Sequence, residues 1–307
     1  MNTSLLLGNG INRCILSEIS WGNLLDAIAR EYDVKLNQDV SFPMQFECLV
    51  NQILKERDIP SDSIYSEIKA KISAPLINAR LPMSAPHTAF STRADCLLTT
   101  NYDFLLEQSM DVGLDVPSFP SYPGQNINKY NLRNSYKVGG KEVFHIHGDI
   151  LRTQSICLGY EHYAGTLQNL RGEVARKKKI GQEEKPNIIL LLEGMVKSSL
   201  SDSSDRTVWA EKFFTDNIHI VGLGLSESEI DLWWLITYRA YLYYSDRFGA
   251  KSLIHNRIVY HDIGIESDKK MRYMLTNNAV EYRFHRINSL NNENFFREYE
   301  RIAQSIF

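Results

Sequence analysis

The stretch that decides the fold is residues 95–104, Asp-Cys-Leu-Leu-Thr-Thr-Asn-Tyr-Asp-Phe, where a short apolar run ends abruptly in small polar groups. A buried strand of a parallel sheet reads as such an apolar run, and ligands of these sheets lie just beyond the carboxyl ends of the strands. This position predicts that Asn101 and Asp103 lie where chemistry would happen. Two other stretches, 5–10 and 218–224, have the same form, an apolar run followed by glycines.

Composition limits the class of protein. The chain has 307 residues, of which 43% are hydrophobic and 23% charged, and its net charge is -3. These proportions are typical of a globular protein without a broad basic surface, so we expect no direct nucleic-acid binding. The length fits one α/β domain with insertions, and we expect a single domain over residues 1–307. No apolar run approaches the roughly 20 residues that cross a bilayer and no secretory signal opens the sequence, which predicts a cytoplasmic protein without membrane contact.

The four cysteines are widely spaced and form no C-x-x-C pair; they are Cys14, Cys48, Cys96 and Cys157. Structural zinc sites and disulfide frameworks use paired or regularly spaced cysteines. We therefore expect buried, reduced thiols.

Apolar runs alternate with helical periodicity along most of the chain. Strands are predicted at 3–8, 96–99, 143–149, 155–158, 218–221, 257–261 and 280–284. This alternation predicts an α/β fold with a doubly wound parallel sheet. Helical insertions at about 18–90 and 160–216 interrupt the pattern.

The second insertion contains three further signals. The charge run at 176–185 is predicted to be a solvated loop, because acidic residues follow the basic ones at once. The apolar helix predicted at 187–200 suits burial in the core or a contact in an oligomer. Residues 201–205 have the composition of a turn.

Two loops carry closely spaced glycines at the ends of predicted strands. Gly8 and Gly10 allow a tight turn that brings bare N–H groups against a phosphate, although the same pattern also suits an ordinary turn. In the later loop, Ser226 and Glu229 have the spacing of a capping box. That spacing predicts that the glycines of this loop directly precede a helix N-terminus, which favours an anion.

A histidine pair ends the strand predicted at 143–149. Strict alternation would point His145 and His147 to the same face, and Gly148 would end the strand. A histidine at a strand end suits acid–base chemistry near neutral pH, and a satisfied structural imidazole is the alternative.

Four strand-end motifs therefore stand in a fixed order: Gly8-Asn9-Gly10, Thr100-Asn101-Tyr102-Asp103, His147-Gly148-Asp149 and Gly222-x-Gly224-x-Ser226. Together they resemble the sirtuin superfamily, and most closely the sirtuin-like proteins of prokaryotic antiphage systems. The resemblance implies a Rossmann-like domain that binds NAD. Sirtuin deacylases carry paired C-x-x-C zinc motifs between the His-Gly motif and the late glycine loop, where this chain has only Cys157. A domain with no zinc module and no metal is therefore implied.

The resemblance implies an NAD hydrolase that cleaves the nicotinamide–ribose bond to nicotinamide and ADP-ribose, and depletes NAD as an abortive-infection effector. Asn101 would hold the ribose hydroxyls and a water, His147 would serve as base or ribose anchor, and Asp103 would fix the nicotinamide or the loop. The residues implied to hold the rest of NAD are Gly8, Asn9, Gly10, Ile11, Asn12, Arg13, Thr100, Gly222, Gly224 and Ser226.

An effector of this kind must stay silent until it is triggered. The expected partners besides NAD are further copies of the chain in a homo-oligomer and, from the resemblance, a HerA-type ATPase or another defence-system protein. Three alternatives stay open: a sensor that binds NAD or ADP-ribose without cleaving it, a structural subunit with a vestigial site, and a deacylase or ADP-ribosyltransferase.

Overall fold

A seven-stranded sheet forms the centre of the computed structural model, which describes residues 1–16, 19–57, 60–82, 86–116, 130–197 and 208–307. Its strands lie side by side in the order β3 (Tyr136–Val138), β4 (Lys141–His145), β2 (Cys96–Thr99), β1 (Thr3–Leu7), β7 (Asn217–Val221), β8 (Ile258–Gly264) and β9 (Glu281–Arg286). Neighbouring strands of this sheet are parallel, except that β3 and β4 are antiparallel. The predicted α/β fold with a parallel sheet is confirmed.

The central strand β1 marks the point where the strand order reverses. Leu5 pairs with Leu97 of β2 on one side and with His219 of β7 on the other. The chain builds one half of the sheet from β1 through β2 to β4, and the other half from β7 through β8 to β9. The sheet is thus doubly wound and Rossmann-like, and sheets of this kind bind ligands beyond the carboxyl ends of the strands at the reversal.

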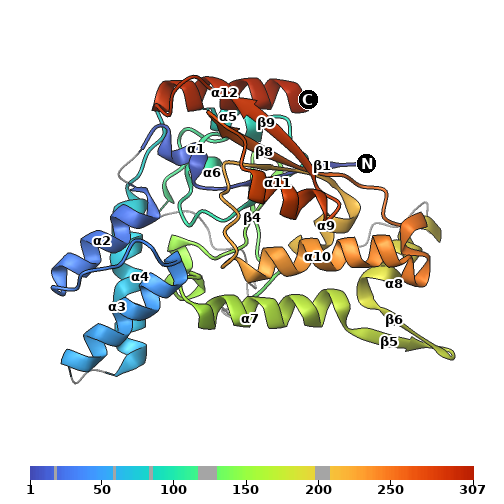
Figure 1. Ribbon diagram of the computed structural model, residues 1–307, viewed down its shortest axis with the longest axis horizontal. Helices are drawn as coiled ribbons and strands as arrows, with labels where there is room; N and C mark the ends of the chain where they lie inside the picture. The colour runs from blue at the N-terminus through green and yellow to red at the C-terminus, as the bar shows by residue number, and fades with distance from the viewer. Residues whose placement is uncertain (17–18, 58–59, 83–85, 117–129, 198–207) are drawn as a thin grey trace.

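Helices cover both faces of the sheet (Figure 1). One face carries α1 (Gly10–Arg13), α5 (His87–Ser91), α6 (Leu105–Gln108) and α12 (Asn292–Ile306); the other carries α8 (Asn187–Lys197), α9 (Lys212–Thr215), α10 (Ile230–Ser245) and α11 (Lys269–Thr276), with α7 (Tyr160–Leu170) alongside α10. Strand alternation explains the two layers. Leu5 and Leu7 pack in one cluster with Ile302 of α12, whereas Leu6 packs in another with Leu235 of α10.

Three helices form a lobe beside the sheet, in the interval predicted as the first helical insertion. They are α2 (Trp21–Glu31), α3 (Phe42–Glu56) and α4 (Ser61–Ile77), which lie together at one end of the molecule (Figure 1). Leu25, Phe46 and Ile68 are fully buried in a cluster that these helices share with Tyr102 and Phe104 of the loop after β2. The lobe is therefore packed against the carboxyl end of β2.

Two predictions about strands were wrong. The strand predicted at 155–158 is absent: a 3-10 helix, η3 (Ile150–Ser155), is followed by residues outside any strand. The side chain of Asp149 accepts the N–H groups of Leu151 and Arg152 and so starts η3 where the apolar pattern suggested a connection between strands. The density of Pro, Gly, Asn and Tyr at residues 113–142 predicts an irregular loop, but the short strand β3 lies within this interval, of which residues 117–129 lie outside the described part.

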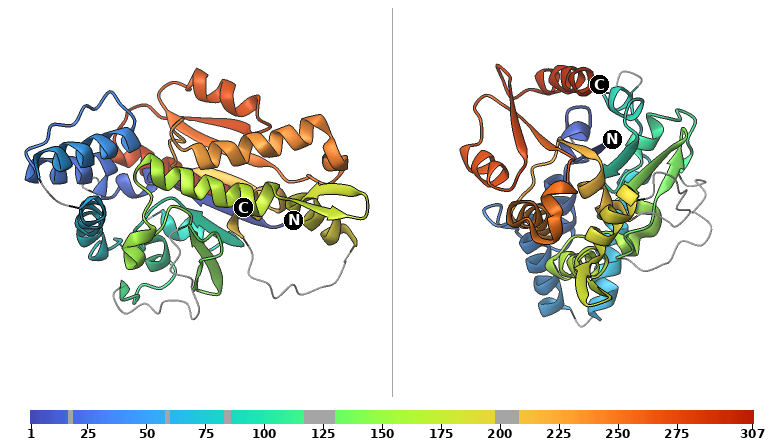
Figure 2. Two further views of the ribbon diagram at one scale, coloured as in Figure 1. Left: turned by 90° about the horizontal axis from the view of Figure 1, so that it is seen from below. Right: turned by 90° about the vertical axis from the view of Figure 1, so that its right-hand side faces the viewer.

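The charged segment predicted to be a solvated loop is a β-hairpin. Its strands are β5 (Lys177–Ile180) and β6 (Glu183–Pro186), and the hairpin projects from the end of the molecule that lies farthest from the helical lobe (Figure 2). Most of its residues are exposed, as the solvated reading predicted. The apolar helix begins at Asn187 as predicted; residues 198–207, with the predicted turn at 201–205, lie outside the described residues.

Two further predictions concern the membrane and the thiols. In the part of the chain that the structure describes, no helix has the length and apolarity needed to cross a membrane. Cys14, Cys96 and Cys157 are buried, as predicted, whereas Cys48 is exposed on α3. Burial raises the pKa of the Cys14 and Cys96 thiols to about 12, so both stay protonated at neutral pH.

Candidate active site

A cavity of about 630 Å³ lies at the carboxyl end of the sheet, where the strand order reverses. The loops after β1, β2, β4 and β7 and the end of β8 line it, and α2, α3 and α12 close its sides. This volume is within the range of about 300–1,000 Å³ that small-molecule and cofactor sites occupy. The predicted site residues that line it are Asn9, Gly10, Arg13, Thr100, His147, Gly222, Gly224 and Ser226.

His147 and Asp231 form a buried pair on the cavity wall. The Nε2 atom of His147 lies 3.0 Å from Oδ2 of Asp231, which stands in the first turn of α10. The imidazole packs edge-on against Tyr163, with ring centroids 5.2 Å apart. Burial alone would lower the pKa of His147, but the charge of Asp231, its hydrogen bond and the charge of Glu229 outweigh burial and raise that pKa above its ordinary value.

Glu229 adds a second carboxyl group beside this pair. It lines the cavity, and its Oε2 is buried without a hydrogen-bond partner among the described residues. Burial raises the pKa of Glu229 to about 7, against the opposing effect of His147. At neutral pH both forms of this carboxyl group are populated. It can therefore accept a hydrogen bond from a ligand hydroxyl group or donate one to it.

The predicted capping box at the late glycine loop is absent. Helix α10 begins at Ile230 with Glu229 at its N-cap, and Ser226 Oγ accepts the N–H of Ser228 in a turn of its own. Several residues therefore separate Gly222 from the start of α10, and the prediction that the glycines directly precede a helix N-terminus was wrong. The spacing of Ser226 and Glu229 matched the motif, but the turn between them leaves the helix to start later.

The glycines of the two loops serve to bring the loops together. The N–H of Gly8 donates to the carbonyl of Val221, and the N–H of Gly10 donates to that of Gly222 at 2.7 Å. A Cβ atom on Gly8 would lie 2.5 Å from Cα of Leu223, closer than such atoms approach. The prediction that Gly8 and Gly10 present bare N–H groups to a phosphate was wrong, because the neighbouring loop already accepts them.

Asn12 and Asp103 are brought together away from the cavity. Asn12 Nδ2 donates to Asp103 Oδ2 at 2.8 Å, the N–H of Leu105 donates to Oδ1, and Asn12 Oδ1 accepts from Nε2 of His87. Burial raises the pKa of Asp103 to about 6 and lowers that of His87 to about 3. Because its carboxylate is held in this way, Asp103 positions the loop after β2 in this structure and does not line the cavity. Ile11 is likewise buried in the core.

Asn101 is held by its backbone. Its N–H donates to Thr99 Oγ1, and its carbonyl accepts from Nδ1 of His145 at 2.8 Å. The side-chain Oδ1 of Asn101 is buried and has no hydrogen-bond partner among the described residues, while the neighbouring Thr100 and Tyr102 line the cavity. The structure fixes the position of Asn101, whose buried amide oxygen has no partner among the described residues but whose side chain is not among those that line the cavity.

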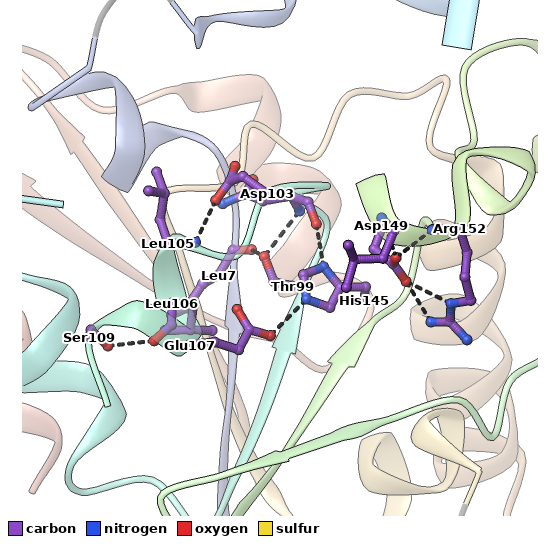
Figure 3. Close-up of polar contacts among 12 residues, drawn as sticks. Leu7, Thr99, Asp103, Leu105, Leu106, Glu107, Ser109, His145, Asp149 and Arg152 are labelled. Atoms are coloured by element: carbon purple, nitrogen blue, oxygen red, sulfur yellow. Dashed lines mark hydrogen bonds and ion pairs between the residues drawn. The ribbon is translucent and has the colours of Figure 1, made fainter. Parts of the chain in front are cut away.

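His145 and Glu107 form a second buried ion pair, shown in Figure 3. Nε2 of His145 lies 2.8 Å from Glu107 Oε1, and both side chains are fully buried. Since Nδ1 also donates to the Asn101 carbonyl, both ring nitrogens are donors, as in the imidazolium form. Burial would lower the pKa of His145, but Glu107, with smaller effects of Asp149 and the carbonyl, raises it to about 9.

The two histidines do not share a face. β4 ends at His145, and a turn follows at residues 146–147. His145 therefore faces α6, and His147 reaches α10. The predicted strand to residue 149 was too long, and its alternation could not hold beyond His145.

Residues 95–216 match the family model of the SIR2-like domain. The chain carries a SIR2-like domain. This finding confirms the resemblance to sirtuins and fits an NAD-dependent enzyme, since SIR2-like domains bind NAD. No curated protein matches the chain. The match starts next to β2 and ends before β7, so it includes Asn101, Asp103 and His147, whereas Asp231 and both glycine loops lie outside it.

The cavity has features that suit NAD. The cavity is large enough, aromatic rings of Trp21, Phe42 and Tyr163 line it, and Arg13 supplies a cation. Among the described residues, no group of three or more His, Cys, Asp or Glu side chains is placed to hold a metal ion.

A row of three histidines crosses the sheet beside the cavity and is called the histidine row. Nδ1 of His219 lies 2.9 Å from Nε2 of His261, Nδ1 of His261 lies 2.9 Å from Nε2 of His285, and Nδ1 of His285 lies 3.1 Å from Glu298 of α12. A carboxylate only accepts, so in neutral rings each Nδ1 must carry the proton. Burial lowers the pKa of all three rings, which keeps them neutral.

Sequence reasoning missed Asp231, Glu229 and the histidine row. Asp231 follows the late glycine loop by a few residues, and a carboxylate in the first turn of a helix is common enough to carry no signal. His219 and His261 stand on predicted strands and His285 directly follows the strand predicted at 280–284, so a search for histidines at the same face of neighbouring strands would have found them.

Proposed function

We propose that this SIR2-like domain hydrolyses NAD at the nicotinamide–ribose bond and releases nicotinamide and ADP-ribose. The observation that carries the proposal is the His147–Asp231 pair, in which His147 lines the cavity at the strand reversal and buried Asp231 holds its Nε2, in a chain with a domain whose family binds NAD. A histidine held by a buried carboxylate is a common arrangement for moving a proton at neutral pH.

Cleavage of the nicotinamide–ribose bond does not require a general acid. Nicotinamide leaves NAD as a neutral base, so the site needs no group to protonate it, unlike sites for ordinary glycoside hydrolysis. The site must instead limit bulk water, steady the positive charge that develops on the ribose and orient one water. The ring centroids of Trp21 and Tyr102 lie 4.2 Å apart. Together with Tyr163 these rings form an aromatic wall that restricts the access of water.

His147 is placed to take the proton of the attacking water. Its Nε2 is engaged with Asp231, and its Nδ1 has no hydrogen bond with a described residue, while the ring lines the cavity. The water oxygen bonds to the ribose C1′, the bond to nicotinamide breaks with its electron pair leaving on nicotinamide, and the water proton passes to Nδ1. The Asn101 amide, whose oxygen lacks a partner among the described residues, is the group we propose to orient that water.

The remaining parts of NAD follow from the charges of the cavity. We propose that Arg13 faces the diphosphate. Among the described residues that line the cavity, no other arginine or lysine is present to neutralise the diphosphate charge. Glu229 would accept a ribose hydroxyl with its buried, unpaired oxygen. Thr100, Gly222, Gly224 and Ser226 would contact the ligand by backbone or hydroxyl groups.

The biological role that we propose rests on the resemblance to antiphage sirtuin-like proteins. In this role the chain depletes NAD as an abortive-infection effector, acts as a homo-oligomer and is switched by a partner such as a HerA-type ATPase. NAD loss in infected cells, compared between wild type and His147→Ala, tests the role separately from the chemistry.

The direct test incubates the protein with NAD and quantifies nicotinamide and ADP-ribose. His147→Ala should lower turnover on the order of 10²–10⁴-fold while NAD still binds, because general-base catalysis contributes that much. Asn101→Ala should also lower turnover while NAD still binds, because the attacking water would lose the group that orients it. Asp231→Asn should lower turnover by removing the charge that holds His147. Asp62→Asn is the matched control, since Asp62 also stands in the first turn of a helix, at an exposed position of α4. Wild-type turnover in His147→Ala and Asp231→Asn would refute the assignment.

A further inference from the structure

A second cavity, of about 360 Å³, lies at the opposite end of the sheet from His147. Residues at the starts of β8 and β9 line it, with the middle of α10 on its other side. Strands begin at this end, so the cavity is separate from the candidate active site, which lies where the same strands end. No part of the proposed NAD reaction uses it.

Arg239 of α10 is a buried cation in the lining of this cavity. It is 4% exposed, and its guanidinium donates to the carbonyl of Asn256 at 2.5 Å, to Asn256 Oδ1 at 3.0 Å and to the carbonyl of Ala279 at 3.4 Å. These acceptors are all neutral. Within the described part of the chain no carboxylate lies at ion-pair distance from Arg239, although buried arginines are almost always paired with a negative charge.

The guanidinium is held in a fixed direction. Asn256 Nδ2 donates to the carbonyls of Phe213 and Asp216, at 2.9 and 2.7 Å, which orients Oδ1 of the same amide toward Arg239. A guanidinium that is already ordered loses less side-chain entropy when it binds an anion. Burial lowers the pKa of Arg239 to about 10, as expected for a charge that lacks a counter-ion.

Further cations stand at the rim. Lys251 and Arg257 are exposed and line the same cavity. The acidic residue in the described lining is Glu281, and Arg257 and Arg283 both bind it. The cations of the lining therefore outnumber its carboxylates, and the local charge is positive in a chain whose net charge is -3.

We propose that this second cavity binds a small phosphorylated ligand. The buried guanidinium of Arg239 would face the phosphate from the floor, Lys251 and Arg257 would neutralise its second charge from the rim, and Tyr243 would flank the rest of the ligand. Nε and Nη2 of Arg239 already donate to Asn256, so Nη1, whose hydrogen bond to the Ala279 carbonyl is 3.4 Å long, is the part of the guanidinium left to donate to a phosphate oxygen. The volume is near the lower limit of ligand sites, which favours a mononucleotide or sugar phosphate over a dinucleotide.

The test is calorimetric titration of the full chain with inorganic phosphate, with chloride at equal ionic strength as reference. Wild type should bind phosphate saturably, and Lys251→Ala and Arg257→Gln should each weaken binding about tenfold, the loss expected for one charged hydrogen bond. Both side chains are exposed, so these variants should fold, which circular dichroism checks. Lys177→Ala on the hairpin β5–β6 is the matched control for charge removal and should bind as wild type.

Three outcomes would overturn the proposal: no saturable phosphate binding to wild type, an equal response to chloride, or unchanged binding in Lys251→Ala and Arg257→Gln. Phosphate could also enter the first cavity, so Arg13→Ala is titrated in parallel. Binding that Arg13→Ala abolishes and the rim variants leave intact would place the phosphate in the first cavity and refute the assignment to the second.

Discussion

Replacing Glu107 by glutamine should remove most of the pH dependence that His145 gives to the stability of the fold. Both side chains are fully buried, and Nε2 of His145 donates to Glu107. The pKa of His145 rises from 6.5 to about 9 in the folded protein. At about 1.4 kcal/mol for each pH unit, this rise corresponds to about 3 kcal/mol of folding free energy.

The direction of the pH dependence of stability follows from which state, folded or unfolded, binds the His145 proton more tightly. The folded protein holds the His145 proton up to pH of about 9, whereas the unfolded chain releases it near 6.5. The contribution is therefore complete below pH 6.5 and is lost as the pH rises through 9. In Glu107→Gln the buried imidazole has no counter-charge and should be neutral, so that this decline should disappear.

The assay is urea unfolding of wild type and Glu107→Gln at several pH values from 6 to 10, with the free energy of unfolding extrapolated to water. The variant should be less stable by about 3 kcal/mol at pH 6, and the gap should close as the pH passes 9. Glu293→Gln, which removes one partner of an exposed i,i+4 pair with Arg297, is the control and should change stability by less than about 1 kcal/mol. A gap between Glu107→Gln and wild type that stays constant across this range would refute the reasoning.

Three further predictions concern packing, ligand binding and acid. Gly8→Ala should lower the free energy of unfolding by about 1–3 kcal/mol, because its Cβ would lie 2.5 Å from Cα of Leu223; unchanged urea midpoints would show that the loops part freely. Trp21→Ala should raise the dissociation constant for NAD about tenfold in calorimetry by removing one aromatic wall, and equal affinity would place NAD elsewhere. His219→Gln should reduce the acid sensitivity of the fold: the pKa of His219 falls to about 4, so its contribution is present above 6.5 and lost as the pH falls toward 4, and urea unfolding across that window should show a shallower decline than in wild type.

Segments with strong local signals could be predicted from the sequence. The strand 96–99 has the predicted bounds, and the terminal helix occupies residues 292–306, the range that its helical pattern predicts from the sequence, since polar residues or a side-chain cap mark where each begins. Asn291 accepts the N–H of Asn294 and caps that helix. The hairpin β5–β6 was missed because its strands lack the alternation of apolar and polar residues that identifies a half-buried strand: most of their residues are charged and exposed.

The sequence predicted where the candidate site lies, but not which of its side chains face the cavity. The strand-end rule located His147, Thr100 and Gly222 on one cavity, because the carboxyl ends of parallel strands meet at one edge of the sheet. It could not separate residues that face a ligand from residues that face each other. Asp103 has the residue type and the place of a catalytic group, yet Asn12 occupies its carboxylate.

The partner of His147 depends on a contact between residues 84 positions apart. Local periodicity predicts a helix from Leu232 to Asp246, which begins one residue after Asp231, but it does not give the rotation of that helix against the sheet. That rotation is set by packing of residues such as Leu235 against Ile220, and only the assembled core fixes it. The absence of a charged partner for Arg239 among the described residues likewise depends on how α10 packs in the assembled core, so the sequence could not predict it.

The central position of β1 has a consequence for how the chain reaches its fold. β1 is synthesised before its two neighbours, yet Leu5 pairs with Leu97 and with His219. The sheet therefore cannot close around its middle strand until β7 has emerged from the ribosome, whereas the lobe α2–α4 gathers its core from consecutive helices. Contacts between distant residues slow folding and leave apolar strands open to wrong pairing. A chain with this strand order can pair β1 with β2 early, but the edge of β1 that faces β7 stays open until residues 217–221 have been synthesised.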